Sequence, residues 1–324
     1  MLSLTKGEMK LAQIRGGMYD KQILKYTDKK SSKPLRLSSE SLIKPKYPVE
    51  YIDEDYYIEQ MGKIDREKKY ENLELIRSAI EKNNSRGLPK HLSELYSNAM
   101  NKIISEAKKS FSIPDNGMLY PLPIVIPNQV DHIFVAGATG SGKSTWVSNY
   151  IYYYKKFFPK REIFVFSRLK EDEVLDKHSV TRVEIDDQLL DEPMNPKEFV
   201  EESKYGALVI FDDIASIPDK DLNKEIHRIR DDLLEVGRHH NISVISTSHM
   251  LMDYKKTRNL LNEASAVVFF PKTSSKYHIN RYLKVYGGLS AKEIEKIMSL
   301  NSRWVYHRKN VPQLIMYEKG CFLL

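Results

Sequence analysis

The chain has 324 residues, of which 41% are hydrophobic, enough to bury a full α/β core and leave residues for one smaller domain. Its longest apolar run falls far short of the roughly 20 residues that span a bilayer, and no signal-peptide pattern begins it, so we expect a soluble intracellular protein without a transmembrane segment. The single cysteine, Cys321, excludes a disulfide framework and a zinc cluster, and fits a reducing compartment.

The formal net charge of +7 is unevenly distributed along the chain. Residues 1–47 carry 11 Lys and Arg against 4 Asp and Glu, and residues 255–324 carry 13 against 4, so the segment between them is acidic. Two basic ends around an acidic centre favour a polyanionic partner, nucleic acid before membrane. A merely solvated surface explains the charge about as well.

The first part of the chain predicts three segments. Residues 1–47 are basic and rich in Ser and Lys, which indicates a flexible arm. Residues 48–111 contain apolar positions at helical spacing in two stretches, 70–80 and 92–103, and predict a small helical appendage. Residues 112–128 hold four prolines and indicate an extended linker.

Residues 129–324 predict one α/β domain. Short β-branched and aromatic runs alternate with helical patterns, which is typical of a largely parallel sheet with helices on both faces. The expected strands are 131–136, 162–167, 181–185, 207–213, 242–246 and 266–270. Near the end, Ser290 and Glu293 match a helix capping box, and residues 303–307 and 313–317 alternate like a terminal β-hairpin.

A glycine-rich loop follows the first of these strands and precedes a helical pattern, and it matches G-x-x-x-x-G-K-[ST]. Its residues are Gly137, Ala138, Thr139, Gly140, Ser141, Gly142, Lys143, Ser144 and Thr145. The backbone N–H groups of such a loop, together with the dipole of the following helix, bind a triphosphate. Lys143 would reach the β- and γ-phosphates, and the Ser144 hydroxyl would bind Mg²⁺.

An acidic pair ends the strand at 207–213. Asp212 at the carboxyl end of a buried strand can hold Mg²⁺ through water, and Asp213 can orient and deprotonate the attacking water. Such pairs are common surface features, but this one lies about seventy residues after the glycine loop, which is typical of a Walker B strand.

Two further candidates surround the strand at 242–246. Arg238, just ahead of it, could reach the triphosphate of a neighbouring subunit, and the alternative is an arginine that offsets a helix dipole. The arginines at 228, 230 and 258 are rival candidates. His249 follows the strand and could sense the γ-phosphate, although a single histidine is more often a structural residue.

The chain resembles the DNA-packaging ATPases of nucleocytoplasmic large DNA viruses and their relatives, in the FtsK–HerA superfamily of P-loop proteins. The resemblance covers roughly residues 130–324 and depends on four stretches: GATGSGKST at 137–145, IFDDI at 210–214, GRHHNISVI at 237–245 and SRWVYHRKNVPQLIMYEKG at 302–320. Residues 1–110 match nothing that we can name.

The resemblance implies an ASCE or RecA-like P-loop fold and a homo-oligomeric ring. The ring would hydrolyse ATP with Mg²⁺ to drive double-stranded DNA into a preformed capsid, through a capsid or portal-vertex partner. It would act at the viral assembly site in the host cytoplasm or with the virion. By position, Lys143 and Ser144 take the phosphate and Mg²⁺ roles, the pair at 212–213 the Walker B roles, and Arg238 the role of a finger in trans.

Two residues depart from the superfamily pattern. Asp213 stands where many ASCE-type proteins have Glu, and a shorter side chain moves the carboxylate away from the water. His249 stands where Gln is frequent. Two other functions stay open: a small-molecule kinase, which needs an arginine-rich lid that the 228–230 segment does not resemble, and a non-hydrolysing protein that binds ATP as a structural ligand.

Overall fold

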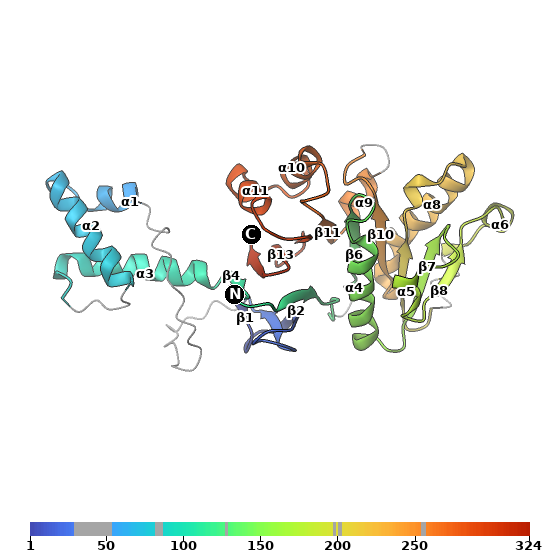
Figure 1. Ribbon diagram of the computed structural model, residues 1–324, viewed down its shortest axis with the longest axis horizontal. Helices are drawn as coiled ribbons and strands as arrows, with labels where there is room; N and C mark the ends of the chain where they lie inside the picture. Colours follow the sequence, from blue (N-terminus) through green and yellow to red (C-terminus); the bar gives the residue numbers. More distant parts are fainter. Residues whose placement is uncertain (29–53, 82–86, 127–128, 197–198, 200–202, 254–256) are drawn as a thin grey trace. The chain divides into compact units, whose positions relative to one another are not determined.

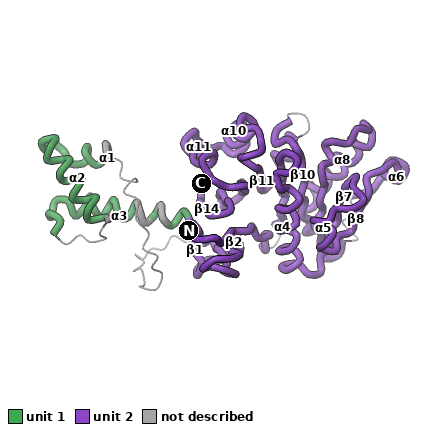
Figure 2. The backbone as a smooth tube through the Cα atoms, viewed as in Figure 1, with its two compact units in different colours: residues 1, 28–110 green, residues 2–27, 111–324 purple. Residues whose placement is uncertain are grey.

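The computed structural model describes residues 1–28, 54–81, 87–126, 129–196, 199, 203–253 and 257–324. The chain forms two compact units, one of residues 1 and 28–110 and the other of residues 2–27 and 111–324 (Figure 2). Part of the expected arm, residues 29–47, lies outside the described residues.

The first unit is helical, as its sequence pattern predicts. Its helices are α1 (Glu54–Gln60), α2 (Arg66–Glu81), the short 3₁₀ helix η2 (Lys90–Leu92) and α3 (Ser93–Ala107) (Figure 1). Apolar residues spaced three and four apart on α2, Leu73, Ile76 and Ile80, are fully buried. They form a small separate core with residues of α1 and α3, so this unit has its own hydrophobic centre.

A ten-stranded sheet runs through the second unit, in the order β4-β14-β13-β12-β11-β6-β10-β9-β7-β8. The strands from β11 to β8 are parallel, and those from β12 to β14 pair antiparallel. The strands are β4 (Ser110–Ser112), β6 (His132–Ala136), β7 (Glu162–Ser167), β8 (Thr181–Glu184), β9 (Ala207–Phe211), β10 (Ser243–Ser248), β11 (Ala266–Phe269), β12 (Val305–Arg308), β13 (Leu314–Tyr317) and β14 (Gly320–Leu323).

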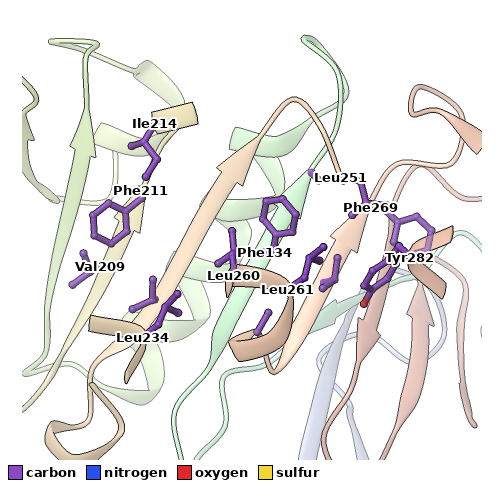
Figure 3. Close-up of a cluster of buried hydrophobic side chains, with 14 of the residues drawn as sticks. Phe134, Val209, Phe211, Ile214, Leu234, Leu251, Leu260, Leu261, Phe269 and Tyr282 are labelled. Atoms are coloured by element: carbon purple, nitrogen blue, oxygen red, sulfur yellow. The ribbon is translucent and has the colours of Figure 1, made fainter. Parts of the chain in front are cut away.

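Helices cover this sheet on both faces. The helices are α4 (Lys143–Phe157), α5 (Glu173–Asp176), α6 (Gln188–Asp191), α8 (Lys220–Val236), α9 (Arg258–Glu263), α10 (Lys276–Val285) and α11 (Ala291–Met298), with 3₁₀ turns η3 (Ile214–Ser216) and η4 (Gly237–His240). One core cluster joins the sheet to α8, α9, α10 and α11, and the other joins it to α4 and α5. Figure 3 shows part of the first cluster, with Phe134, Phe211 and Phe269 among the buried side chains of the sheet.

The predicted fold class is confirmed: the domain is α/β, with a largely parallel sheet between two helical layers. The strand before the glycine loop, β6, and the strand before the acidic pair, β9, are separated by β10, as in RecA-like P-loop proteins. The capping box of Ser290 and Glu293 is present at the start of α11. The predicted terminal hairpin is β12 and β13, and β14 extends it to three antiparallel strands.

Parts of the expected flexible arm and of the proline-rich linker form strands of a second sheet instead, of order β1-β3-β2-β5, while residues 122–126 of the linker are in no helix or strand. Its strands are β1 (Leu2–Ser3), β2 (Met9–Arg15), β3 (Ile23–Tyr26) and β5 (Met118–Pro121). Leu11, Ile14, Leu24 and Leu119 are buried in the cluster that also contains the inner residues of α4. Because apolar side chains of 2–27 gain this burial, the segment folds despite its basic composition.

The side chain of Arg15 connects this second sheet with α4. Its guanidinium group donates hydrogen bonds to the Tyr153 hydroxyl at 2.7 Å and to Asn149 Oδ1 at 2.9 Å. It also lies over the rings of Tyr120, Tyr152 and Tyr153, at 4.3–4.7 Å from their centroids. The helix that begins at the glycine loop is therefore held from the side of the N-terminal sheet.

None of the described helices combines the length and the apolarity that crossing a membrane requires.

Candidate nucleotide-binding site

The glycine loop links the carboxyl end of β6 to the first residue of α4. Gly142 has φ of +107°, a backbone conformation that side chains rarely adopt, and it directly precedes the helix. At Gly137 an added Cβ would lie 2.6 Å from both the Phe270 ring and Ser141 Oγ. The buried Ser141 hydroxyl has no hydrogen-bond partner among the described residues, so the loop keeps a polar atom available.

Lys143 is nearly buried and lies at the centre of the site. Its ammonium group donates a hydrogen bond to the Gly137 carbonyl at 3.0 Å, and lies 3.7 Å from Asp213 Oδ2. A buried ammonium needs such partners because its desolvation is costly. The lysine thus spans the loop and contacts the acidic pair on β9, two strands away in the sheet.

Thr247, near the end of β10, joins the two acids, and the sequence analysis missed it. Its hydroxyl donates to Asp212 Oδ1 at 2.8 Å and accepts the N–H of Asp213 at 2.9 Å. No local pattern marks this residue, because its contact with the acids requires that β10 pair with β9 in the sheet. Asp213 itself has φ of +48°, in the left-handed region, which fixes the direction of its side chain.

His249 bridges the loop and the acidic pair. Its Nε2 lies 3.1 Å from Asp213 Oδ2, and its Nδ1 lies 3.4 Å from Lys143 Nζ and 3.5 Å from the Thr139 hydroxyl. With the proton on Nε2, the ring donates to the carboxylate and accepts from the ammonium group. The candidate for a γ-phosphate sensor is therefore in contact with both groups that the sequence placed at the phosphates.

Burial is the main influence on the pKa of Asp212. It raises the pKa of Asp212 above its usual range, while the hydrogen bond from Thr247 acts in the opposite direction. The negative charge of Asp213 raises the pKa of Asp212 further. A cation beside Asp212 would offset this cost, which makes the carboxylate a suitable ligand for one.

The residues fit an Mg²⁺ ion that is shared with a bound phosphate chain. In the described part of the chain, no group of three or more His, Cys, Asp or Glu side chains could hold a metal ion. Mg²⁺ needs no such group, because it keeps several waters and binds through one or two carboxylates and substrate phosphates. The half-buried Asp212 and the Ser144 hydroxyl in the first turn of α4 are of this type.

Arg238 does not join this cluster. It lies in η4, before β10, and lines a cavity with Val130 and His132 at the amino end of β6. The glycine loop lies at the carboxyl end of β6, roughly 17 Å away along this five-residue strand. Within its own chain Arg238 therefore cannot reach the loop, and a role in trans stays a prediction.

The rival arginines differ in their surroundings. Arg228 forms ion pairs with Glu225 at 2.6 Å and Asp232 at 2.7 Å on the surface of α8. Arg230 is buried and pairs with Asp231 at 2.6 Å. Arg238, in contrast, is exposed and has no hydrogen bond or ion pair within the described residues.

Comparisons with known proteins show a relative from a virophage. No family model matches the chain. It is 42% identical over 223 residues to a Sputnik virophage protein described as "Uncharacterized protein V3", a match that covers 68% of this chain and 87% of that protein.

Solved structures similar to this one include two of packaging proteins. The DNA-packaging ATPase B204 of Sulfolobus turreted icosahedral virus is 17% identical with a TM-score of 0.44, covering 60% of this chain and 98% of that chain. The genome packaging NTPase B204 of Sulfolobus turreted icosahedral virus 2, in complex with AMPPCP, is 19% identical with a TM-score of 0.40, covering 58% and 97%. By its identity to the virophage protein over most of that protein's length, the chain belongs to the family of Sputnik virophage protein V3.

Proposed function

We propose that this protein is an ATPase that moves double-stranded DNA, and that it packages a viral genome into a preformed capsid. The observation that supports hydrolysis most directly is the contact of Lys143, Asp213 and His249, at 3.1–3.7 Å from one another, beside the glycine loop. These groups come from three neighbouring strands and their following loops, so the order of the strands brings them together.

The glycine loop would bind the triphosphate of ATP. The first N–H groups of α4 have no partner within the helix and carry the positive end of its dipole, which suits phosphate oxygens. Lys143 would exchange the Gly137 carbonyl for β- and γ-phosphate oxygens, which are stronger acceptors. The Ser144 hydroxyl and Asp212 would hold Mg²⁺, which neutralises charge on the phosphates when bound.

Asp213 would orient and deprotonate the attacking water. Its backbone is fixed by the hydrogen bond to Thr247, and its carboxylate already lies 3.1 Å from His249. Arrival of a γ-phosphate would compete for Lys143 and change the contacts of His249, so His249 would report whether ATP or ADP is bound. Because this carboxylate is shorter than a glutamate, the water must approach it closely.

Arg238 would act between neighbouring subunits of a ring. In our proposal the exposed guanidinium group of one subunit stabilises charge on the transferring phosphoryl group of its neighbour. DNA would be gripped by basic side chains that contact phosphates without regard to sequence, which the positive charge of residues 255–324 favours. The site of action would be the viral assembly site in the host cytoplasm or the virion, with a capsid or portal-vertex protein as partner.

A small-molecule kinase is disfavoured by the surroundings of its candidate lid arginines. Arg228 and Arg230 lie inside the 17-residue helix α8 and are engaged by neighbouring carboxylates. A lid that closes over an acceptor substrate needs arginines free to approach the phosphates. The non-hydrolysing alternative is disfavoured because Asp213 and Thr247 are already in hydrogen-bonding contact.

The test is steady-state ATP hydrolysis with Mg²⁺, with and without double-stranded DNA, for wild type and Lys143→Ala. We expect DNA to raise the wild-type rate, the variant to be inactive in both conditions, and the exposed Lys170→Ala to behave as wild type. A rate indifferent to DNA would contradict the motor function. Mixing Arg238→Ala subunits with Lys143→Ala subunits then tests the trans role, because activity returns only if each subunit type can supply what the other lacks.

A further inference from the structure

A cavity of about 90 Å³ opens beside the glycine loop. Its walls include Ser141, Gly142 and Thr145 of the loop, and aromatic side chains from four different parts of the second unit. The aromatic residues are Tyr120 of β5, Trp146 and Tyr150 of α4, Phe270 after β11, and Trp304 of the C-terminal segment. Such a combination of flat apolar walls with a few polar groups is typical of a small-molecule site.

We propose that this cavity binds the base and ribose of the nucleotide whose phosphates occupy the glycine loop. The inference depends on the proposed nucleotide binding and specifies which residues complete that site. Thr145 belongs both to the loop and to the cavity, so a nucleotide extending from Lys143 past Thr145 would enter it. Aromatic side chains can stack on the flat face of any nucleotide base.

The C-terminal segment supplies one wall and holds it by hydrogen bonds. Glu318 accepts from the backbone N–H of Arg303 at 2.8 Å, and its own backbone N–H donates to the Ser302 hydroxyl at 3.2 Å. The Ser302 hydroxyl also lies 2.7 Å from the carbonyl oxygen of Trp304. These contacts give a role to the Ser-Arg-Trp and Glu residues of the terminal motif, which the phosphate chemistry does not use.

Arg303 is suited to contact the nucleotide. Its guanidinium lies 3.5 Å from where a Cβ at Gly142 would stand, so it reaches the loop. Its side chain is exposed and has no hydrogen bond or ion pair among the residues that the structure describes. A guanidinium group in this position can stack on a base or donate to the phosphate nearest the ribose.

The N-terminal sheet supplies another wall. Tyr120 is held by Arg15, whose guanidinium lies 4.3 Å from the ring centroid and also donates to Asn149 of α4. Asn149 lines the cavity as well and donates to the Thr145 carbonyl at 2.9 Å. Through Arg15, the N-terminal segment thus fixes one side of the proposed pocket.

The two tryptophans of the chain, Trp146 and Trp304, both line the cavity, so intrinsic fluorescence reports its occupation. We would titrate wild type with ATP and with inorganic tripolyphosphate, which has the phosphates but no base. ATP is expected to bind on the order of ten to a hundred times more tightly and to change the tryptophan emission. Tripolyphosphate, measured by calorimetry, is expected to bind without that change.

The variants separate this inference from the proposed function. Tyr120→Ala should weaken ATP binding roughly tenfold and leave tripolyphosphate unchanged, Tyr120→Phe should behave as wild type, and the exposed Arg303→Ala should weaken ATP more than tripolyphosphate. Equal affinity of wild type for both ligands, or equal effects of both Ala variants on both ligands, would overturn the base pocket. Failure of wild type to bind either ligand would instead refute the proposed nucleotide binding.

Discussion

The hydroxyl group of Thr247 holds the acidic pair together, and its removal is the sharpest test of the site's geometry. The side chain is 1% exposed, and its oxygen donates to Asp212 and accepts from the N–H of Asp213. Thr247→Val removes the hydroxyl and keeps the shape of the side chain. The variant leaves a largely buried carboxylate without its donor and a backbone N–H without its acceptor.

The expected cost follows from these two lost hydrogen bonds. A hydrogen bond to a charged group contributes about 1.5–3 kcal/mol, and an unsatisfied buried donor costs about 1–3 kcal/mol. The two losses share one oxygen and are not additive, so we expect a decrease of roughly 2–4 kcal/mol in the free energy of unfolding. If about 1.4 kcal/mol of this stabilisation is also lost in the transition state for hydrolysis, the rate of hydrolysis falls about tenfold.

Urea unfolding followed by tryptophan fluorescence and steady-state hydrolysis measure the two effects. Thr247→Ser keeps the hydroxyl and is the matched control, expected to retain most of the activity. If Thr247→Val matched wild type in both stability and rate, the proposed link between the threonine and the acidic pair would be wrong.

Three further results are expected. Asp212→Asn removes a half-buried charge and should raise stability at neutral pH in EDTA while abolishing hydrolysis. Because the pKa of Asp212 is raised, this gain should shrink as the pH falls through the raised pKa and be absent below the ordinary range of a carboxyl group, as urea titrations at several pH values would show. Burial lowers the pKa of His307 to about 4, so the free energy of unfolding of wild type should fall by up to about 3 kcal/mol between pH 6.5 and 4. His307→Gln should lose less over this range, and an equal loss would show that another group titrates. Arg15→Ala should cost about 1–3 kcal/mol and speed amide hydrogen exchange in β2 and β5, whereas unchanged exchange would show that the N-terminal sheet is held without it.

Most of the fold could be predicted because the central strands are short, continuous and apolar. The run at 162–167 coincides with β7, and the runs near 132, 207 and 266 lie within two residues of strands. The N-terminal sheet could not be predicted so well, since Lys and Ser after residue 28 dominate the composition of the first 47 residues. Leu11 and Ile14 carried a weaker signal, and their burial depends on the distant helix α4.

The site was predictable where one stretch of sequence defines it. The glycine loop and the acidic pair follow strands whose carboxyl ends must meet at one edge of a parallel sheet, so the contact of Lys143 with Asp213 could be expected. The contact of Thr247 with the acidic pair depends on the order of the strands, and the position of Arg303 beside the glycine loop depends on the path of the C-terminal segment. Neither is encoded by a local pattern, because the partners lie 35 and 161 residues from Asp212 and Gly142 in sequence.

The central claim, that hydrolysis at Asp213 moves DNA, is tested most directly by displacement of a third strand from a DNA triplex. Wild type with ATP and Mg²⁺ is predicted to displace the third strand, while Asp213→Asn binds ATP as wild type does and displaces none. If wild type hydrolyses ATP and leaves the triplex intact, or if Asp213→Asn displaces the strand equally well, hydrolysis at this site does not drive translocation.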